Sequence, residues 1–232
     1  MNRLFHCLTV LIAVASTCVA AAPALAADTP RDLLVSAAFG TRDKSVALAR
    51  IASAMRGTEA ALARNPADRE ARLQRALALS YRGKLNRNRA DLIAARKAFE
   101  ALVASRPGDA ESLLALAGWN LGAVIELGPM MARAGLGARK ALGLKALDRA
   151  VAMSDGRAMF PAFASFTRIQ LDPADIVEAR RLAELAVSAV AATQVDRIMQ
   201  RQAAAILPLL RAGNGKAAAK SATLMLPFGR IE

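Results

Sequence analysis

Apolar residues recur at helical spacing through most of this 232-residue chain, and Pro or Gly closes most of the periodic segments. No segment alternates apolar and polar residues in the way that a half-buried strand does. The composition agrees, since 55% of the residues are hydrophobic but only 4% are aromatic. The apolar residues are mostly Ala, Leu, Val and Met, which favour closely packed helices over strands. The sequence therefore predicts an all-α protein.

The Pro and Gly residues at the ends of these periodic segments divide the chain into a series of expected helices. We expect them over residues 42–64, 69–82, 90–105, 108–127, 157–171 and 195–211, with one opened by Asp172 and Pro173 and a last one between Gly215 and Pro227. Glycines weaken the pattern over residues 130–153, where we expect two shorter pieces. Residues 83–89 are expected to form a surface loop, with Asn88 capping the helix that follows.

The first 26 residues have the layout of a secretory signal peptide. Arg3 supplies the basic residue, residues 8–14 form the apolar run, and Ala24 and Ala26 form a small-x-small cleavage site. The apolar run is shorter than the roughly 20 residues of a transmembrane anchor. An uncleaved anchor and a lipid anchor on Cys18 are the alternatives. We expect cleavage after Ala26, which leaves one domain over residues 27–232 in the periplasm, with secretion as the less favoured location.

Cleavage would remove every cysteine and histidine, because Cys7, Cys18 and His6 all lie within the signal. The mature chain then has no side chain for a thiolate nucleophile, a Ser-His-Asp triad or a Cys/His zinc site. A haem axial histidine and disulfide bonds are excluded for the same reason. We therefore expect no cofactor and no metal.

The charge is strongly positive. Lys and Arg number 32 against 19 Asp and Glu, a formal net charge of +13. In an exported protein this excess favours an anionic envelope surface, an acidic glycan or an acidic protein as partner, and we expect no nucleic acid. A solvated, Arg-rich surface without a dedicated partner is the alternative.

Two similar helix breaks, at Pro66 and Pro107, lie roughly 40 residues apart. Ala95 and Phe99, followed by Pro107, fit the later half of the tetratricopeptide pattern, Ala-x3-Phe and then Pro. The family period is about 34 residues, so this chain has several extra residues in each unit. The connection over residues 83–89 is the expected place for them.

The helix after Pro107 carries the earlier half of the same pattern. Its matching residues are Leu113, Leu116 and Ala117, whereas Asn120 stands where an aromatic residue is expected. Residues 50–121 therefore resemble a tetratricopeptide repeat, with Phe99 expected to pack on these residues across the turn. The resemblance implies antiparallel helix pairs stacked as an α-solenoid or right-handed superhelix. It also implies a non-catalytic scaffold whose concave face holds a peptide or helix of another protein.

The expected partner-binding residues lie on the first helices of the pairs and on the basic connection. They are Arg72, Arg75, Tyr81, Arg82, Lys84, Arg87, Arg89, Trp119 and Asn120. Arginine forks suit a carboxylate of an acidic partner, and aromatic side chains are frequent anchors in binding sites. A solvated helix face for the arginines, and a role of Trp119 in the core, are the alternatives. The oligomeric state does not follow from these residues.

Two other functions remain open from the sequence. An exported α-helical enzyme that cleaves cell-wall glycans needs carboxylates alone, and Glu126 lies in a long apolar stretch where burial would raise its pKa. A helix-terminal Glu126 that points into water is the alternative. The helical layout also resembles accessory components of periplasmic solute-uptake systems. We expect the non-catalytic scaffold.

Overall fold

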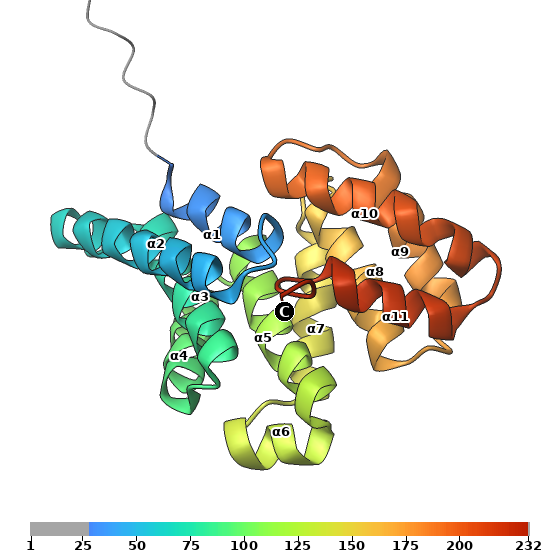
Figure 1. Ribbon diagram of the computed structural model, residues 1–232, viewed down its shortest axis with the longest axis horizontal. Coiled ribbons are helices and arrows are strands. Elements are labelled where there is room, and N and C mark those ends of the chain that lie inside the picture. The colour runs from blue at the N-terminus through green and yellow to red at the C-terminus, as the bar shows by residue number, and fades with distance from the viewer. Residues whose placement is uncertain (1–27, 232) are drawn as a thin grey trace, which may run out of the picture.

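The computed structural model describes residues 28–231, and every regular element in that range is a helix (Figure 1). The helices are α1 (Pro30–Phe39), α2 (Lys44–Arg64), α3 (Arg69–Asn86), α4 (Arg89–Ser105), α5 (Ala110–Leu127), α6 (Pro129–Leu136), α7 (Lys140–Ala152), α8 (Met159–Leu171), α9 (Ile176–Ser188), α10 (Gln194–Arg211) and α11 (Gly215–Met225). The all-α prediction is confirmed for this range. The expected signal over residues 1–26 lies outside the described residues.

The helices pack in two rows, an inner one and an outer one. An inner row runs α1, α3, α5, α8, α10, each in contact with the next. A second helix packs on each member of the row, in the order α2, α4, α7, α9, α11. Figure 1 shows the blue-to-green helices and the orange-to-red helices on opposite sides of α5. This arrangement is compatible with a helical-repeat fold.

The buried apolar residues form four clusters instead of one central core. The first joins α1, α2 and α3 with Phe228, and the second joins α3 to α6. The third joins α5, α7 and α8 with Leu182 of α9, and the fourth joins α8 to α11. Each cluster lies between neighbouring helices, as in folds stabilised by nearest-neighbour contacts. The apolar packing therefore surrounds the centre of the molecule and does not fill it.

Several helix ends lie where the sequence predicts them. Asn88 caps α4 by accepting hydrogen bonds from the amides of Ala90 and Asp91. α5 ends at Leu127, immediately before Gly128. The stretch that follows is split as expected, because Gly137 takes a left-handed conformation (φ 73°) between α6 and α7.

Other local predictions are wrong. Residues 83–86 are the last turn of α3 and not a loop, because Leu85 is half-buried against the first cluster. The turn is confined to Arg87 and Asn88, so most of the residues expected in the loop lengthen α3 instead. Asp172 ends α8 instead of capping α9, since its carboxylate accepts from the Ala174 amide in a turn, and the helix begins at Ile176.

The first described helix, α1, is not among the expected ones. Thr29 and Asp32 form a capping box at its start, and Pro30 occupies the first helical position. These are standard helix-start signals that lie directly after the expected cleavage site. α1 contributes Leu34, Ala37 and Ala38 to the first cluster. The packed helices therefore begin earlier in the chain than the sequence pattern indicates.

The expected packing across the Pro107 turn is only partly correct. Phe99 is buried at 1% exposure, but it packs in the second cluster with Leu73 and Trp119. Leu116 contacts that cluster, whereas Leu113 and Ala117 face α7 and α8 in the third. The reason is that α5 is central and has apolar residues on more than one side, so its two faces serve different neighbours.

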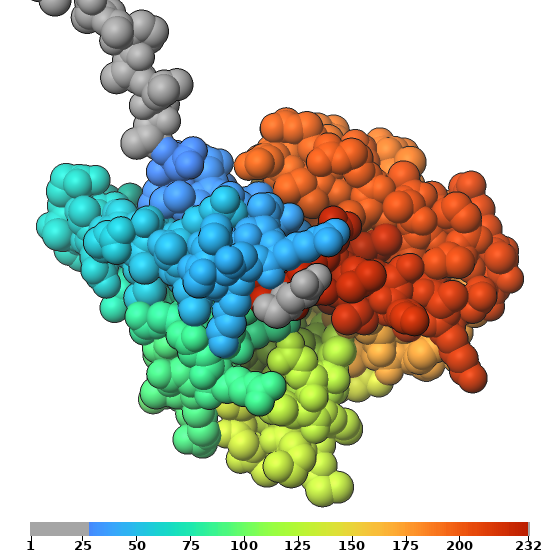
Figure 2. Space-filling view, in the orientation of Figure 1, coloured from blue at the N-terminus to red at the C-terminus, as the bar shows by residue number. Residues whose placement is uncertain are grey.

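The segment after α11 returns to the first helix. The Phe228 amide donates a hydrogen bond to the Ala38 carbonyl at 3.0 Å. The Phe228 ring meets Tyr81 of α3 edge-on, with the ring centroids 4.8 Å apart. Figure 2 shows the blue and red parts of the chain meeting near the middle of this face. The inner row of helices is thus joined at its two ends.

Among the described helices, α5 alone has the length and mean hydropathy of a membrane span. Its contacts with α4, α6, α7 and α8 account for that apolar character.

Candidate functional site

The inner row of helices surrounds a cavity of about 820 Å³. Small-molecule sites typically measure about 300–1,000 Å³ and have mostly apolar walls. The wall here is largely apolar and comes from all five helices of the inner row, with additions from α4, α6 and residues 226–228. The cavity is therefore built from segments that span almost the whole described chain.

Small residues on α5 leave room along one wall. Ala115, Gly118, Gly122 and Ala123 all line the cavity, at spacings that place them on one face of the helix. At Gly118 a Cβ atom would lie 3.0 Å from the Phe163 ring, so the absence of a side chain permits that close packing. At Gly122 a Cβ would meet nothing within 4 Å. Gly122 thus borders open space.

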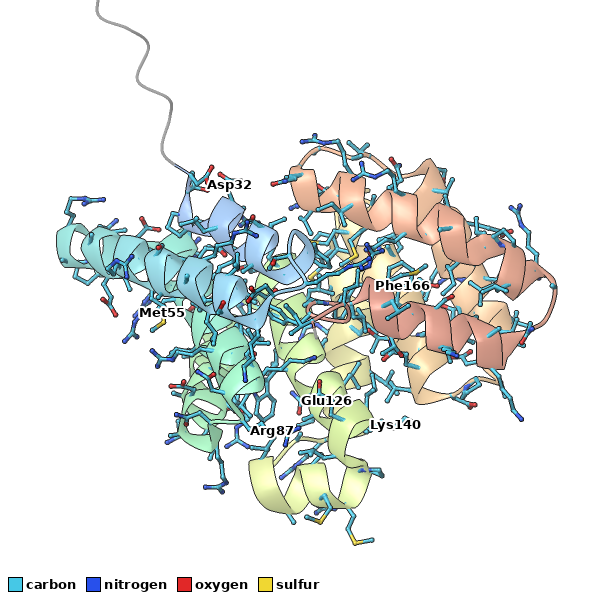
Figure 3. All side chains as sticks on the ribbon, in the orientation of Figure 1. Asp32, Met55, Arg87, Glu126, Lys140 and Phe166 are labelled. Atoms are coloured by element: carbon cyan, nitrogen blue, oxygen red, sulfur yellow. The ribbon has the colours of Figure 1, made fainter. Side chains whose placement is uncertain are left out.

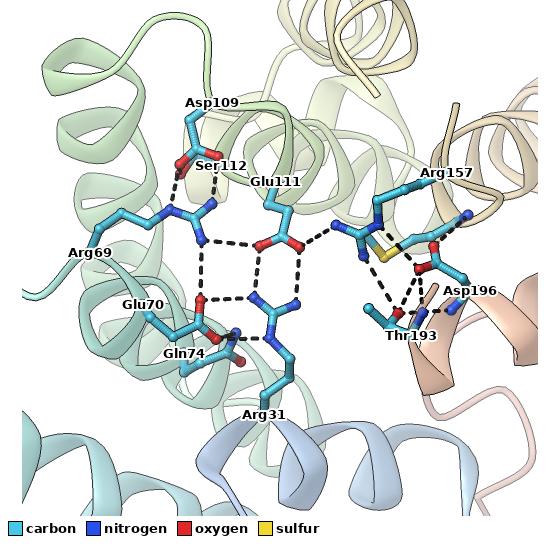
Figure 4. Close-up of polar contacts among 11 residues, drawn as sticks. Arg31, Arg69, Glu70, Gln74, Asp109, Glu111, Ser112, Arg157, Thr193 and Asp196 are labelled. Carbon is cyan, nitrogen blue, oxygen red and sulfur yellow. Dashed lines mark hydrogen bonds and ion pairs between the residues drawn. The ribbon is translucent and has the colours of Figure 1, made fainter. Parts of the chain in front are cut away.

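One end of the cavity, at the N-terminal ends of α3 and α5, is bordered by an arginine–carboxylate network, whose Arg31 and Glu111 belong to the wall (Figure 4). Arg31 donates two hydrogen bonds to Glu70, both 2.8 Å long, and two to Glu111, of 3.0 and 2.7 Å. Arg69 donates to Asp109 at 2.8 Å and to Glu111 at 3.1 Å. The network therefore ties α1, α3 and α5 together.

Arg157 extends the network to the C-terminal helices. Its guanidinium donates to Glu111 at 2.8 Å and to Asp196 at 3.1 Å. Asp196 is fully buried and also accepts from the amides of Met159 and Thr193. This carboxylate fixes the start of α10 against the start of α8.

Glu111 is the centre of the network because three arginines contact it. Burial by itself would raise the pKa of Glu111, but hydrogen bonds from Arg31 and Arg157 outweigh it and lower the pKa to about 2. The pKa of Asp109 is lowered in the same direction, since hydrogen bonds from Arg69 and Ser112 outweigh its burial. These carboxylates are ionised at neutral pH and act as structural anions.

The other end of the cavity, at the C-terminal ends of α3 and α5, is basic. Lys84, Arg87 and Arg89 line it, and Glu126 is the acid that accompanies them. Figure 3 labels Arg87 and Glu126. Lys84 Nζ lies 2.6 Å from Glu126 Oε1, which links α3 to α5. Arg89 Nε donates to the Gly135 carbonyl at 2.8 Å. The Arg87 amide donates to the Lys84 carbonyl at 3.3 Å, whereas its guanidinium makes no hydrogen bond or ion pair with the described residues.

The structure brings only part of the predicted binding set to the cavity. Its wall includes these five members of the set: Tyr81, Lys84, Arg87, Arg89 and Trp119. Arg72 and Arg75 are exposed on α3 and do not line it, while Arg82 is held by Asp91 through two bonds of 2.7 Å. Asn120 is buried and has a structural role, because it accepts from the Arg139 amide and donates to the Leu116 carbonyl.

Trp119 is both a core residue and a wall residue. It is 6% exposed within the second cluster, and the Arg96 guanidinium lies 5.7 Å from the ring centroid. Its Nε1 atom is buried and has no hydrogen-bond partner among the described residues. The Thr167 hydroxyl, another part of the cavity wall, is in the same situation.

Glu126 lacks the burial on which the enzyme alternative depends. Its side chain is 49% exposed and pairs with Lys84, as expected for a solvated helix-terminal acid. Within residues 28–231, no three His, Cys, Asp or Glu side chains are placed to hold a metal ion.

The sequence analysis missed the network and the space beside α5. Apart from the adjacent Arg69 and Glu70, the acids and arginines that pair in the network are 39 to 80 residues apart, so no local motif connects them. The glycines at 118 and 122 are a local signal, because glycine is unfavourable inside a helix and two of them at helical spacing mark a face that needs room.

No protein-family model, no curated protein and no solved structure matches this chain.

Proposed function

We propose that this protein is a non-catalytic binding module of tetratricopeptide-like helix pairs, and that it holds an elongated, mostly apolar ligand in the central cavity. The observation that carries the proposal is the 820 Å³ cavity with an apolar wall. Five inner helices supply that wall, which is where a curved stack of helix pairs presents its concave face. Apolar walls with few polar groups are typical of ligand sites.

The acids of the cavity favour binding over catalysis. Glu111 is held ionised by three arginines, and Glu126 pairs with Lys84. Glu111 is therefore not available as a general acid, and Glu126, at 49% exposure, lacks the buried surroundings that the glycan-cleaving alternative would need.

The test uses an uncharged fluorescent probe, N-phenyl-1-naphthylamine, whose emission rises in an apolar site. The parent protein should bind it, and Gly122→Trp should lose most of that binding because the indole would occupy the open space beside α5. Gly122→Ala is the matched control, since it makes a similar backbone change with little added volume. Equal binding by the parent and by Gly122→Trp would show that the probe does not use this cavity.

A second candidate is a protein scaffold that uses the outer face of α3. Arg72 and Arg75 are exposed there, where they could meet an acidic segment of another protein. Charge reversal at both should then reduce capture of an envelope protein without unfolding the chain, because exposed substitutions usually change stability by about 0.5 kcal/mol or less. Capture should also weaken as salt rises. Undiminished capture by the reversed protein would exclude this face.

We also propose that the protein acts in the cell envelope after export, where a role beside a solute-uptake system would suit a ligand carrier. The sequence layout of residues 1–26 supports export. The intact mass of the protein from its native host should correspond to a chain that starts at Ala27. A retained N-terminus in the membrane fraction would favour the anchor instead.

A further inference from the structure

The two ends of the cavity differ in charge, and this difference identifies the class of ligand. We propose that the ligand is a single-chain amphiphile with a carboxylate head, oriented with its head at the basic end and its chain along α5. This inference rests on the proposed function and adds the head group and the orientation to it.

The basic end has an excess of positive charge. Lys84, Arg87 and Arg89 face one acid, Glu126, among the described wall residues. At the opposite end three arginines are matched by four carboxylates within the network, so the residues described there offer an anion no free cation. A carboxylate head group would therefore be attracted to the basic end and not to the network.

Helix dipoles do not reverse this preference. α3 and α5 end at the basic end and bring the negative ends of their dipoles to it. α4 begins at Arg89 and α6 at Pro129, so the positive ends of two other helices lie in the same region. The opposing dipoles largely offset one another, which leaves the side-chain cations to decide.

The dimensions suit a long chain. Glu111 and Glu126 line opposite ends of the cavity, and the 15 residues from one to the other on α5 rise by about 22 Å. This is roughly the length of an extended 16-carbon chain. Between the two ends the wall is formed by the small residues of α5 and by apolar side chains that include Leu77, Phe163 and Met199.

The experiment compares palmitate with methyl palmitate, which has the same chain but no charge, by displacement of N-phenyl-1-naphthylamine. The parent should prefer palmitate by about three- to tenfold, the size expected for one or two solvent-accessible charge contacts. Arg87→Gln combined with Arg89→Gln should abolish the preference. Arg72→Gln combined with Arg75→Gln is the matched control and should keep it, since these arginines lie on α3 outside the cavity.

The uncharged reporter separates the two proposals. A parent that binds N-phenyl-1-naphthylamine but has no preference for palmitate would overturn the anionic head while leaving the apolar site intact. A preference lost in the Arg72/Arg75 variant and kept in the Arg87/Arg89 variant would overturn the proposed orientation. A parent that binds none of the three molecules would overturn the proposed function itself. Each variant must retain reporter binding and its melting temperature to be interpreted.

Discussion

Arg31 and Glu111, which are 80 residues apart in the chain, are joined by two hydrogen bonds of 3.0 and 2.7 Å. The same guanidinium holds Glu70, so one side chain of α1 fixes the starts of both α3 and α5. Glu111 in turn contacts Arg69 and Arg157. The relative position of the inner helices, and with it the shape of the cavity, depends on this carboxylate.

Replacing Glu111 should therefore be costly. Glu111→Gln would leave three partly buried arginines without their shared anion, and the loss of one partner from such a group costs about 3 kcal/mol or more. We expect the midpoint of urea unfolding to fall accordingly. Glu100→Gln is the control, because Glu100 is 53% exposed and makes only a 3.6 Å contact with Arg96. A Glu111→Gln protein as stable as the control would show that the network contributes little.

The network should also make stability depend on acid. The pKa of Glu111 is lowered from 4.5 to about 2 in the folded protein, so the unfolded chain takes up a proton at higher pH than the folded one does. The stabilisation from Glu111 is then complete above about pH 4.5 and is lost as the pH falls toward 2, by about 2–3 kcal/mol. Urea unfolding at pH 5 and pH 3 measures it. The Glu111→Gln variant should show a smaller decrease over the same interval.

Phe99 should be essential to the second cluster. The ring is 1% exposed among residues of α3, α4 and α5, so Phe99→Ala should cost about 3–5 kcal/mol and lower the melting temperature. Val177→Ala is a suitable control, because Val177 is 73% exposed and should change stability very little. An unchanged melting temperature for Phe99→Ala would contradict the packing of α3 on α4.

Replacing Arg87 by glycine should raise the stability of the fold and weaken the binding of palmitate. It takes a left-handed conformation (φ 53°) that glycine adopts without strain, so Arg87→Gly should stabilise the fold by about 1 kcal/mol. The same change should weaken palmitate binding by about threefold or more, because it removes a cation from the basic end. Asp155→Gly relieves a similar conformation (φ 48°) outside the cavity wall and should affect stability alone. Thermal unfolding and reporter displacement measure the two effects.

Removing the acid from the basic end should have the reverse effect on binding. Glu126→Gln frees Lys84 from its 2.6 Å ion pair and raises the local positive charge. We expect the preference for palmitate over methyl palmitate to increase by about threefold. Glu184→Gln removes an exposed acid that is not part of the wall and should leave the preference unchanged. A reduced preference in Glu126→Gln would mean that Glu126 positions Lys84 for the ligand.

The sequence predicts the helix caps and helix ends that depend on residues close together in the chain. Asn88 caps its helix, Gly128 ends α5 and Gly137 separates α6 from α7, because capping and left-handed turns are decided within a few residues. The start of α9 was predicted incorrectly because an Asp-Pro pair is equally compatible with a turn, and here the turn follows α8 directly.

The residues of the candidate site are harder to predict from local sequence patterns. Lys84, Arg87 and Arg89 are a local cluster and could be singled out, yet nothing in their spacing distinguishes them from Arg72 and Arg75. The rotation of α3 about its axis decides whether Lys84 or Arg72 and Arg75 face the cavity, and the packing of the whole inner row sets that rotation. The pairing of Arg31 with Glu111 depends on the same long-range arrangement.

The hydrogen bond from the Phe228 amide to the Ala38 carbonyl has a consequence for how the protein folds. Phe228 follows Ala38 by roughly 190 residues, and contacts at such separation carry a large loop-closure cost and form late in folding. The side of the helix array that this contact joins is therefore completed last. A molecule already lying against α5 at that stage would be covered from that side when Phe228 reaches α1.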